Sequence, residues 1–394
     1  MDPARPEGAP AEDWMPETAR MFSRSSNILL PIAVDVGFSA VRMMQLQVVN
    51  HRLRVRAAWT MDFPLTLRRE EERQEFVIDA IQDVLKGKRF KGRLAVTAVP
   101  NHLVQFKSFR IPKMPPEEIA SAVLFEAEER FAFKSEDAEY RYLDSGHIRQ
   151  GQEIRHEIIA MGCTGEALRN HLELFKKTGL VCTATDVAPC AVVRCLEDDA
   201  PPSEDQGPAR MYADIGTHAT RIITTLEGRI IFIKSIAVGG LALNELTAKG
   251  LNLPLDEATQ LRREILMSTP EPEDDNATSM EQEVLEAANA AIRPGVEQLG
   301  KEISLCLRYH AVTFRGVRPS HLICVGGQSY DRQLLQTITE ITGVQAIQGA
   351  PLERIENRKV FTETQWRSGL LEWATAVGLS LRGRLELEAC KEAS

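Results

Sequence analysis

The feature that most constrains the fold of this chain is a short motif that occurs twice, 179 residues apart. The first copy, Asp35-Val-Gly37-Phe-Ser39, follows the apolar run Ile28 to Val34, and the second copy, Asp214-Ile-Gly216-Thr217, follows Met211-Tyr-Ala213. Another segment rich in apolar residues comes after each copy, over 40–49 and over 219–226. Two apolar runs around a short polar segment are typical of two strands joined by a tight turn. The repeat therefore predicts two similar halves, each built around a strand, a turn and a strand.

The rest of the chain alternates short apolar runs with segments whose apolar residues recur at helical spacing, which is typical of an α/β protein. Further strands are expected over 52–59, 94–99, 105–111, 155–163, 181–186, 229–236 and 321–325. Helices are expected over 70–85, 116–131, 164–178, 256–266, 294–314, 331–342 and 366–381, and after Val238-Gly-Gly240. Pro294 fits either the first turn of its helix or a kink within a longer helix. A polar linker is expected over 197–210 and an acidic loop over 268–281.

Composition narrows the classes of function. The 394 residues include 47 basic and 56 acidic side chains, a formal net charge of −9, which argues against a dominant role in nucleic-acid binding. No run approaches the ~18 apolar residues of a transmembrane helix, and the opening Met1-Asp-Pro does not resemble a signal peptide. Residues 1–27, rich in Pro, Ala, Glu and Arg, are expected to form a disordered tail. The seven cysteines form no Cys-x-x-Cys pair and the eight histidines show no metal-ligand spacing, so we expect reduced thiols in a cytosolic protein and no zinc site.

The two turns carry residues suited to holding a polyphosphate from two sides. Glycine lets the backbone approach phosphate oxygens closely, and the hydroxyl of Ser39 or Thr217 adds a donor. Asp35 and Asp214 repel phosphate, but they fit a hard divalent cation that is held largely through water between them and the phosphates. Gly326-Gly-Gln328 follows a buried strand, where glycines let an adenine or a ribose lie near the backbone. Each of these segments taken alone also fits an ordinary turn or tight packing.

The order of these elements resembles the actin-like ATPase superfamily, and within it the PilM family of type IV pilus assembly proteins, relatives of the cell-division protein FtsA. The similarity runs from about Ile28 to about Leu381. It is carried by Ile32 to Arg42, Phe109-Arg-Ile-Pro112, Pro116-Glu-Glu-Ile-Ala120, Asp186-Val-Ala-Pro189, Asp214-Ile-Gly-Thr217, Val238-Gly-Gly240 and Leu322-Ile-Cys-Val-Gly-Gly327. The resemblance implies an α/β actin-like ATPase fold: two ribonuclease-H-like halves with a small α/β subdomain inserted at the FtsA-like 1C position.

The resemblance also implies subdomain boundaries. Subdomain 1A is expected to comprise 28–104, 186–208 and 354–385, and the inserted subdomain 1C to comprise 105–185. Subdomain 2A is expected over 209–236 and 318–353, and subdomain 2B over 237–317.

Site residues follow from the same resemblance. Gly37, Ser39 and Arg42 are expected to meet the phosphates of ATP from one side, and Gly216, Thr217 and Thr220 from the other. Asp35 and Asp214 are expected to orient the water shell of Mg²⁺. The residues expected nearer the nucleoside are Gly240, Arg262, Gly326, Gly327 and Gln328. Three positions depart from the family pattern: Arg42 stands where a lysine is usual, and Thr259 and Arg262 stand where an acidic residue and a lysine are usual.

By this resemblance the chain is expected to be a cytoplasmic, ATP-binding scaffold of a type IV pilus or type II secretion-like platform at the inner membrane. The family's partner is the N-terminal cytoplasmic tail of a PilN-type membrane protein, which binds at the inserted subdomain and its neighbouring cleft. Other platform proteins are further partners, and the membrane is reached only through them. The resemblance implies at most a slow Mg²⁺-dependent ATPase, names no catalytic residue and leaves self-association open.

Two other functions remain open at the level of sequence. A small-metabolite or sugar kinase of the same fold needs an aspartate as general base, for which Asp62 and Asp186 are available. A nucleotide-free structural adaptor is suggested by the departures at Thr259 and Arg262.

Overall fold

The computed structural model describes residues 27–50, 52–67, 69–133, 137–150, 152–197, 209–267, 279–313, 319–356, 360–362, 365 and 369–392. The expected tail, up to residue 26, lies outside these ranges. So do most of the expected linker over 197–210 and most of the expected loop over 268–281.

The first half of the molecule is built on a six-stranded sheet. Its strands are β1 (Ile28–Leu29), β2 (Ile32–Val36), β3 (Ala40–Val49), β4 (Arg52–Asp62), β5 (Leu94–Ala98) and β9 (Val181–Asp186). The spatial order is β4-β3-β2-β5-β9, with β1 also beside β3. Strand β2 pairs with β3 antiparallel and with β5 parallel, and β5 pairs with β9 parallel. Pro31, which has no N–H to donate, separates the apolar run into β1 and β2.

The second half repeats this arrangement in a five-stranded sheet. Its strands are β10 (Ala209–Ile215), β11 (Thr220–Leu226), β12 (Arg229–Ile236), β13 (His321–Val325) and β14 (Gln345–Gln348). The order β12-β11-β10-β13-β14 matches β4-β3-β2-β5-β9 strand for strand, antiparallel and parallel pairs included. The internal repeat in the sequence is therefore a repeat of topology.

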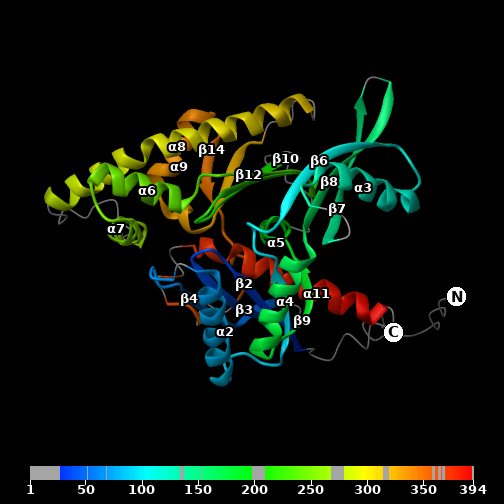
Figure 1. Cartoon of the computed structure of the whole chain (residues 1–394), viewed down its shortest axis with the longest axis horizontal. Helices are drawn as coiled ribbons and strands as arrows, with labels where there is room; N and C mark the ends of the chain where they lie inside the picture. The colour runs from blue at the N-terminus through cyan, green and yellow to red at the C-terminus, as the bar shows by residue number, and fades with distance from the viewer. Residues whose placement is uncertain are drawn as a thin grey trace, which may run out of the picture.

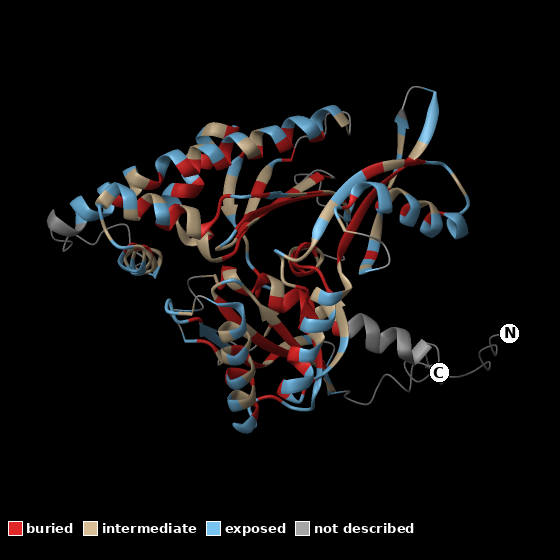
Figure 2. Cartoon of the chain, in the orientation of Figure 1, coloured by how far each residue is buried: buried red, intermediate tan, exposed pale blue. Residues whose placement is uncertain are grey.

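Helices and sheets alternate in five layers (Figure 1). Helices α2 (Glu70–Lys86) and α4 (Gly165–Thr178) cover the outer face of the first sheet, while α5 (Ala188–Leu196) and α11 (Ala374–Glu392) lie between the two sheets. The outer face of the second sheet is covered by α6 (Gly240–Leu251), α8 (Ser279–Thr313) and α9 (Arg332–Thr342). Side chains of β2 alternate between the two faces, with Ile32 and Val34 toward α2 and Ala33 toward α11. Figure 2 shows the buried residues concentrated in the strands and on the inward sides of these helices.

A three-stranded antiparallel sheet stands beside the main body, at the upper right of Figure 1. It consists of β6 (Gln105–Pro112), β8 (Glu153–Thr164) and β7 (Ala138–Gln150), and α3 (Pro116–Arg130) packs on it. Its core includes Phe109, Val123 and Ile158. The Ser145 hydroxyl donates a hydrogen bond to the Ile230 carbonyl of β12, 2.8 Å away, so this small sheet leans on the edge of the second half.

The structure differs from the predicted elements in five places. The last helix begins at Ala374 and not at residue 366, because Gly369 and Leu370 have left-handed φ angles of 84° and 51° that a helix cannot continue through. Helix α8 begins at Ser279, so Pro294 lies inside a longer helix, which was the second of the two predicted placements. Strands β7 and β14 and helix α5 were not predicted; β14 has four residues and α5 nine, which gives little periodicity to detect.

Candidate functional site

Each half presents the same turn at the end of its central strand. The Gly37 N–H donates to the Ala40 carbonyl at 2.9 Å, and the Gly216 N–H donates to the Ala219 carbonyl at 3.2 Å. A Cβ atom at Gly37 or Gly216 would lie 3.0 or 3.2 Å from those same oxygens, closer than side chains normally pack. Glycine therefore lets both hairpins close tightly, and its own N–H is used in closing them.

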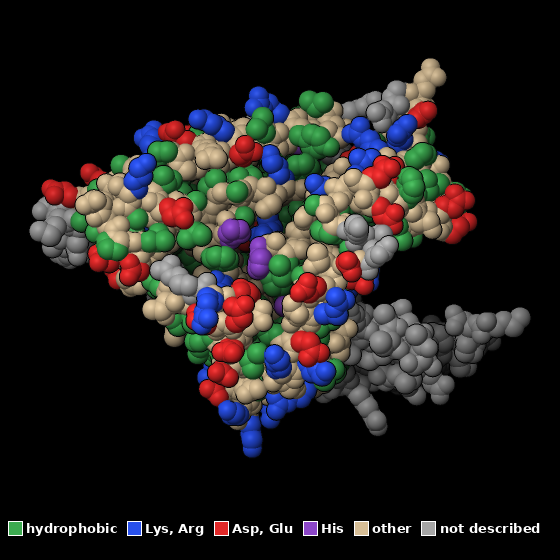
Figure 3. Space-filling view, in the orientation of Figure 1, with side chains coloured by type: hydrophobic (Ala, Val, Ile, Leu, Met, Phe, Trp, Pro, Cys, Tyr) green, Lys and Arg blue, Asp and Glu red, His purple; other side chains and the backbone are tan. Residues whose placement is uncertain are grey.

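The two turns meet across the space between the halves. Ser39 Oγ lies 2.8 Å from Thr217 Oγ1, and the rings of Phe38 and His218 stack with centroids 5.1 Å apart. Figure 3 shows histidine side chains beside the hollow between the two halves on this face. The cavity there is lined by residues of both turns and of the strand end at β13, among them Asp35, Gly37, Ser39, Arg42, Asp214, Gly216, Thr217, Arg221, Gly326 and Gly327.

Glu372 and four charged side chains of the two strand pairs, Asp35, Arg42, Asp214 and Arg221, line this cavity. Burial raises the pKa of Asp35 to about 6, Arg42 and Arg221 act in the opposite direction, and the Asp214 carboxylate adds to the rise. Burial likewise raises the pKa of Asp214, again opposed by the two arginines. Burial lowers the pKa of Arg221, while both carboxylates act to raise it. The two aspartates predicted to share a cation are thus close enough to repel each other.

This donor set fits a magnesium ion bound together with phosphate. Two carboxylates whose ionised forms are disfavoured by burial and by mutual repulsion gain from a divalent cation placed between them. Among the described residues, no group of three or more His, Cys, Asp or Glu side chains could hold a metal alone. Magnesium commonly takes one or two carboxylates and completes its shell with water and phosphate oxygens.

The third segment expected at the nucleotide site, Gly326-Gly327, joins β13 to the short 3₁₀ helix η2 (Gly327–Tyr330) and packs against the second turn. Gly326 has φ = +88°, and a Cβ there would lie 2.6 Å from the Ile215 carbonyl oxygen and 2.8 Å from Asp214 Oδ1. Only glycine fits this conformation and this approach without strain. Nothing lies within 4 Å of the Cβ position of Gly327, so its open side adjoins the cavity.

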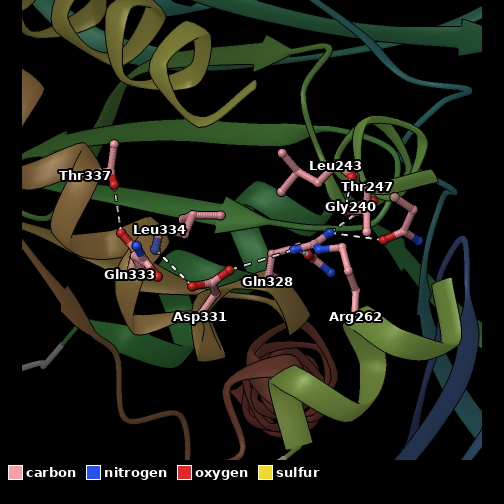
Figure 4. Close-up of polar contacts among 10 residues, drawn as sticks. Gly240, Leu243, Thr247, Arg262, Gln328, Asp331, Gln333, Leu334 and Thr337 are labelled. Carbon is pink, nitrogen blue, oxygen red and sulfur yellow. Dashed lines mark hydrogen bonds and ion pairs between the residues drawn. The ribbon is translucent and has the colours of Figure 1, made fainter. Parts of the chain in front are cut away.

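The remaining residues expected near the nucleoside bind one another instead (Figure 4). Arg262, on α7 (Leu255–Met267), donates to Gln328 Oε1 at 2.9 Å and to Asn244 Oδ1 at 3.0 Å. It also lies 3.8 Å from Asp331 Oδ2 and has only 4% of its side chain exposed. Gly240 touches this group, because a Cβ there would lie 2.6 Å from Gln328 Nε2.

Thr220 and the first residues of α6 have structural partners. The Thr220 hydroxyl is fully buried and donates to the Val238 carbonyl at 2.7 Å, so it is turned away from the cavity. The N–H groups of Gly240 and Leu241 donate to the carbonyls of Gly216 and Thr217, at 3.0 and 2.7 Å. The start of α6 therefore braces the second turn.

Arg221 lines the cavity but was not among the predicted site residues. It lies opposite Asp214 in the pairing of β10 with β11, as Arg42 lies opposite Asp35 in the pairing of β2 with β3. Arg221 is also 179 residues after Arg42, the same offset that separates the two aspartates. The predicted site residues of the second half end at Thr220, so comparing the next position of the two halves would have revealed Arg221.

A second cavity lies between α2 and α4, behind the first turn. Apolar side chains such as Phe63, Val77 and Leu174 line it together with the charged Glu70, Arg73 and Glu166. Gly37, Pro100 and His102 line both this cavity and the first one. The two cavities therefore share a wall.

The two aspartates considered as kinase bases are engaged elsewhere. Asp186 is buried, accepts from Arg194 at 2.9 Å, and accepts from the Val187 N–H at 2.8 Å, at the start of α5. Asp62 lies 3.5 Å from Arg263 of α7. Neither carboxylate lines the cavity between the turns.

The duplicated sheets, the paired Asp-x-Gly turns and the glycine strand exit define a protein of the actin-like ATPase fold. The family model described as "Type IV pilus assembly protein PilM" matches residues 33–384, and the chain belongs to this family.

Solved structures agree with the fold. A "PilM-PilN type IV pilus biogenesis complex" aligns with a TM-score of 0.73 and 23% identity, over 91% of this chain and 99% of the other. The ethanolamine utilization protein EutJ from Carboxydothermus hydrogenoformans aligns with a TM-score of 0.50 and 14% identity, over 90% of each chain. No curated protein sequence matches this chain.

Within its described ranges, the chain has no helix that is both long enough and apolar enough to cross a bilayer.

Proposed function

We propose that this protein is an ATP-binding scaffold of a type IV pilus platform, or of a related type II secretion platform, and that it binds the cytoplasmic tail of a PilN-type membrane protein. The observation that carries the nucleotide part is the meeting of the two repeated turns, with Ser39 and Thr217 2.8 Å apart and an aspartate and an arginine from each half in one cavity. The partner part is supported by family membership and by the similar solved complex of PilM with PilN.

In this proposal the two halves hold the triphosphate from opposite sides. The hydroxyls of Ser39 and Thr217 separate and donate to phosphate oxygens, and Gly37 and Gly216 allow the tight turns that carry these hydroxyls. Arg42 and Arg221 supply positive charge. Arg42 Nε is buried and has no hydrogen-bond partner within the described part of the chain, which leaves a donor for an anion.

Asp35 and Asp214 would hold Mg²⁺ through its water shell. The cation would neutralise phosphate charge at the point where the two carboxylates meet. Arg42 and Arg221 offset the carboxylate charge, which reduces the cost of burying the two ionised aspartates in the cleft. This arrangement serves binding more than rapid turnover, in keeping with a slow ATPase at most.

The cavity between α2 and α4 is the proposed site of the partner's tail. It joins a helix of the first half to the last helix of the 105–185 segment, and its apolar floor with a charged rim suits a short amphipathic segment. Arg73 connects this cavity to the first turn, because its guanidinium lies 4.7 Å from the Phe38 ring and donates to the Phe38 carbonyl. A ligand at either cavity can therefore change the populations of the conformations that Arg73 and the first turn adopt, and in this way affect binding at the other cavity. Through this partner the protein would sit at the cytoplasmic side of the inner membrane.

The nucleotide part is tested by thermal unfolding of the whole chain with and without millimolar Mg²⁺-ATP. We expect the midpoint to rise by several degrees, because a ligand that binds only the folded state stabilises it. The variants Asp35→Asn and Asp214→Asn should each lose most of this rise. A well-folded protein without any rise would favour the nucleotide-free adaptor, which the direct Ser39 to Thr217 contact also accommodates.

The partner part is tested with a peptide corresponding to the N-terminal cytoplasmic tail of a candidate PilN-type protein. Ala167→Arg places a long side chain in the cavity between α2 and α4 and should weaken binding at least about tenfold. Glu173→Arg adds an arginine to the exposed side of the same helix and should leave binding unchanged. Equal binding by both variants would place the tail elsewhere.

A further inference from the structure

Two arginines lie beside Asp35 and Asp214 at the phosphate end of the cleft between the turns. Arg42 and Arg221 come from equivalent positions of the two halves, and both line the cavity. Arg221 is buried, with 6% of its surface exposed. Together with the unpartnered Nε of Arg42, these two side chains offer an anion charge-assisted hydrogen bonds from both sides.

The nucleoside end shows the opposite arrangement. The side chains expected to recognise a base are satisfied by one another, because Arg262 is bonded to Gln328 and Asn244 and faces Asp331 (Figure 4). Asn244 in turn donates to Thr259 Oγ1 at 3.1 Å. Arg262 and Asn244 are both buried, and the Gln328 amide packs directly on Gly240.

A base could bind Gln328 Oε1, Asn244 Oδ1 or the terminal nitrogens of Arg262 only by breaking hydrogen bonds that these atoms already make. Discrimination between bases comes from buried donors and acceptors that the correct base satisfies and the wrong base leaves unpaired. Here such groups are already paired inside the protein. Gly327 has no side chain of its own, and nothing lies within 4 Å of its Cβ position, so this residue makes no contact that distinguishes one base from another.

We infer that this cleft recognises the Mg²⁺-triphosphate group and is indifferent to the base attached to it. Its ligands are then nucleoside triphosphates as a class, with inorganic tripolyphosphate as the minimal member. This inference rests on the proposed binding of a triphosphate between the two turns, and it narrows that proposal to the phosphate part of the ligand.

The test is isothermal titration of the whole chain with the Mg²⁺ complexes of ATP, GTP, CTP and inorganic tripolyphosphate. The four dissociation constants should agree within roughly threefold. ATP binding more than about tenfold tighter than GTP and CTP would overturn the inference while leaving the proposed function intact. Absence of binding by all four would overturn both.

Variants separate the two ends of the cleft. Arg221→Gln should weaken all four ligands by the same factor, roughly tenfold or more, because it removes a charged donor to phosphate. Arg262→Ala should leave the ratio of ATP affinity to tripolyphosphate affinity as in the unmodified chain, and Gln328→Ala provides the same measurement if that variant does not fold. Arg293→Gln removes an exposed arginine from α8 and should change nothing. Selective loss of ATP in Arg262→Ala or Gln328→Ala, with tripolyphosphate binding retained, would show that these side chains hold a base and would overturn the inference.

Discussion

The first and second sheets of this protein have the same strand order and the same central turn, and they differ in what packs around them. In the first half, α11 crosses α5 so closely that a Cβ at Gly378 would lie 1.8 Å from the Ala191 carbonyl oxygen. In the second half, α8 packs on α9 at Gly300, where a Cβ would meet the Ile341 side chain at 2.9 Å. A Cβ at Gly378 would therefore meet the backbone of Ala191, whereas a Cβ at Gly300 would meet side-chain atoms of Ile341.

The two halves are alike where they face the shared cleft and differ in the layers that pack around their sheets. The turn residues agree because both halves face one cavity, where each contributes an aspartate, a glycine, a hydroxyl and an arginine. The surrounding layers have separate tasks. The first half carries the 105–185 segment and the cavity between α2 and α4, and the second half carries the buried Arg262 group. Three experiments compare the halves directly.

The largest difference is expected between Gly378→Ala and Gly300→Ala. Gly378→Ala should lower the free energy of unfolding by about 3 kcal/mol or more, because the Ala191 backbone cannot withdraw from the new methyl group. Gly300→Ala should lower it by less, about 2 kcal/mol at most, because the atoms near the new methyl group belong to the Ile341 side chain and not to backbone. The higher helix propensity of alanine offsets part of this loss. Denaturant unfolding monitored by circular dichroism measures both, and equal losses would contradict the distinction between the two contacts.

One acid-sensitive contact lies in the first half. His171 of α4 is buried, lies 3.1 Å from Thr97 Oγ1 of β5, and has its pKa lowered by burial to about 4. Above the ordinary histidine pKa of about 6.5, both folded and unfolded chains keep this ring neutral, so the contribution is fully present. As the pH falls from 6.5 toward 4, only the unfolded chain binds the proton, and up to about 3 kcal/mol of stability is lost.

Unfolding of the unmodified chain and of His171→Gln between pH 7.5 and pH 4.5 measures this contribution. The variant should be less stable at neutral pH and should lose less stability on acidification. His321→Gln, in the strand β13 of the second half, serves as the control and should follow the unmodified chain. An identical pH dependence in all three proteins would show that His171 is not the sensitive group.

The smallest difference is expected between Ser39→Ala and Thr217→Val. Each removes one of the two hydroxyls that meet at 2.8 Å, so each should reduce stability by about 1 kcal/mol or less and weaken Mg²⁺-ATP a few-fold. The double variant should lose no more stability than one hydrogen bond accounts for, because both single variants break the same contact. If only one variant affected ATP, the two turns would not act as equivalents.

Much of the fold could be predicted from local patterns. The apolar runs before Asp35 and Asp214 fix the central strands, and the turn after each is set by the few residues of the motif. The helices predicted over 70–85 and 116–131 end within one residue of α2 and α3, because long amphipathic periods are strong signals. The predicted start of the last helix was wrong, because left-handed φ angles such as those at Gly369 and Leu370 leave no periodic pattern in the sequence.

The duplicated topology, the family and the pair of repeated turns could all be predicted from the order of residues along the chain. Which side chains reach the cleft between the turns became known from the folded arrangement of the elements. It brought in Arg221, turned the Thr220 hydroxyl toward the Val238 carbonyl, and paired Arg262 with Gln328 from a segment 66 residues away. Strands and turns follow from neighbouring residues, whereas the direction of a buried polar side chain is set by whichever donor or acceptor the packed elements place within hydrogen-bond reach.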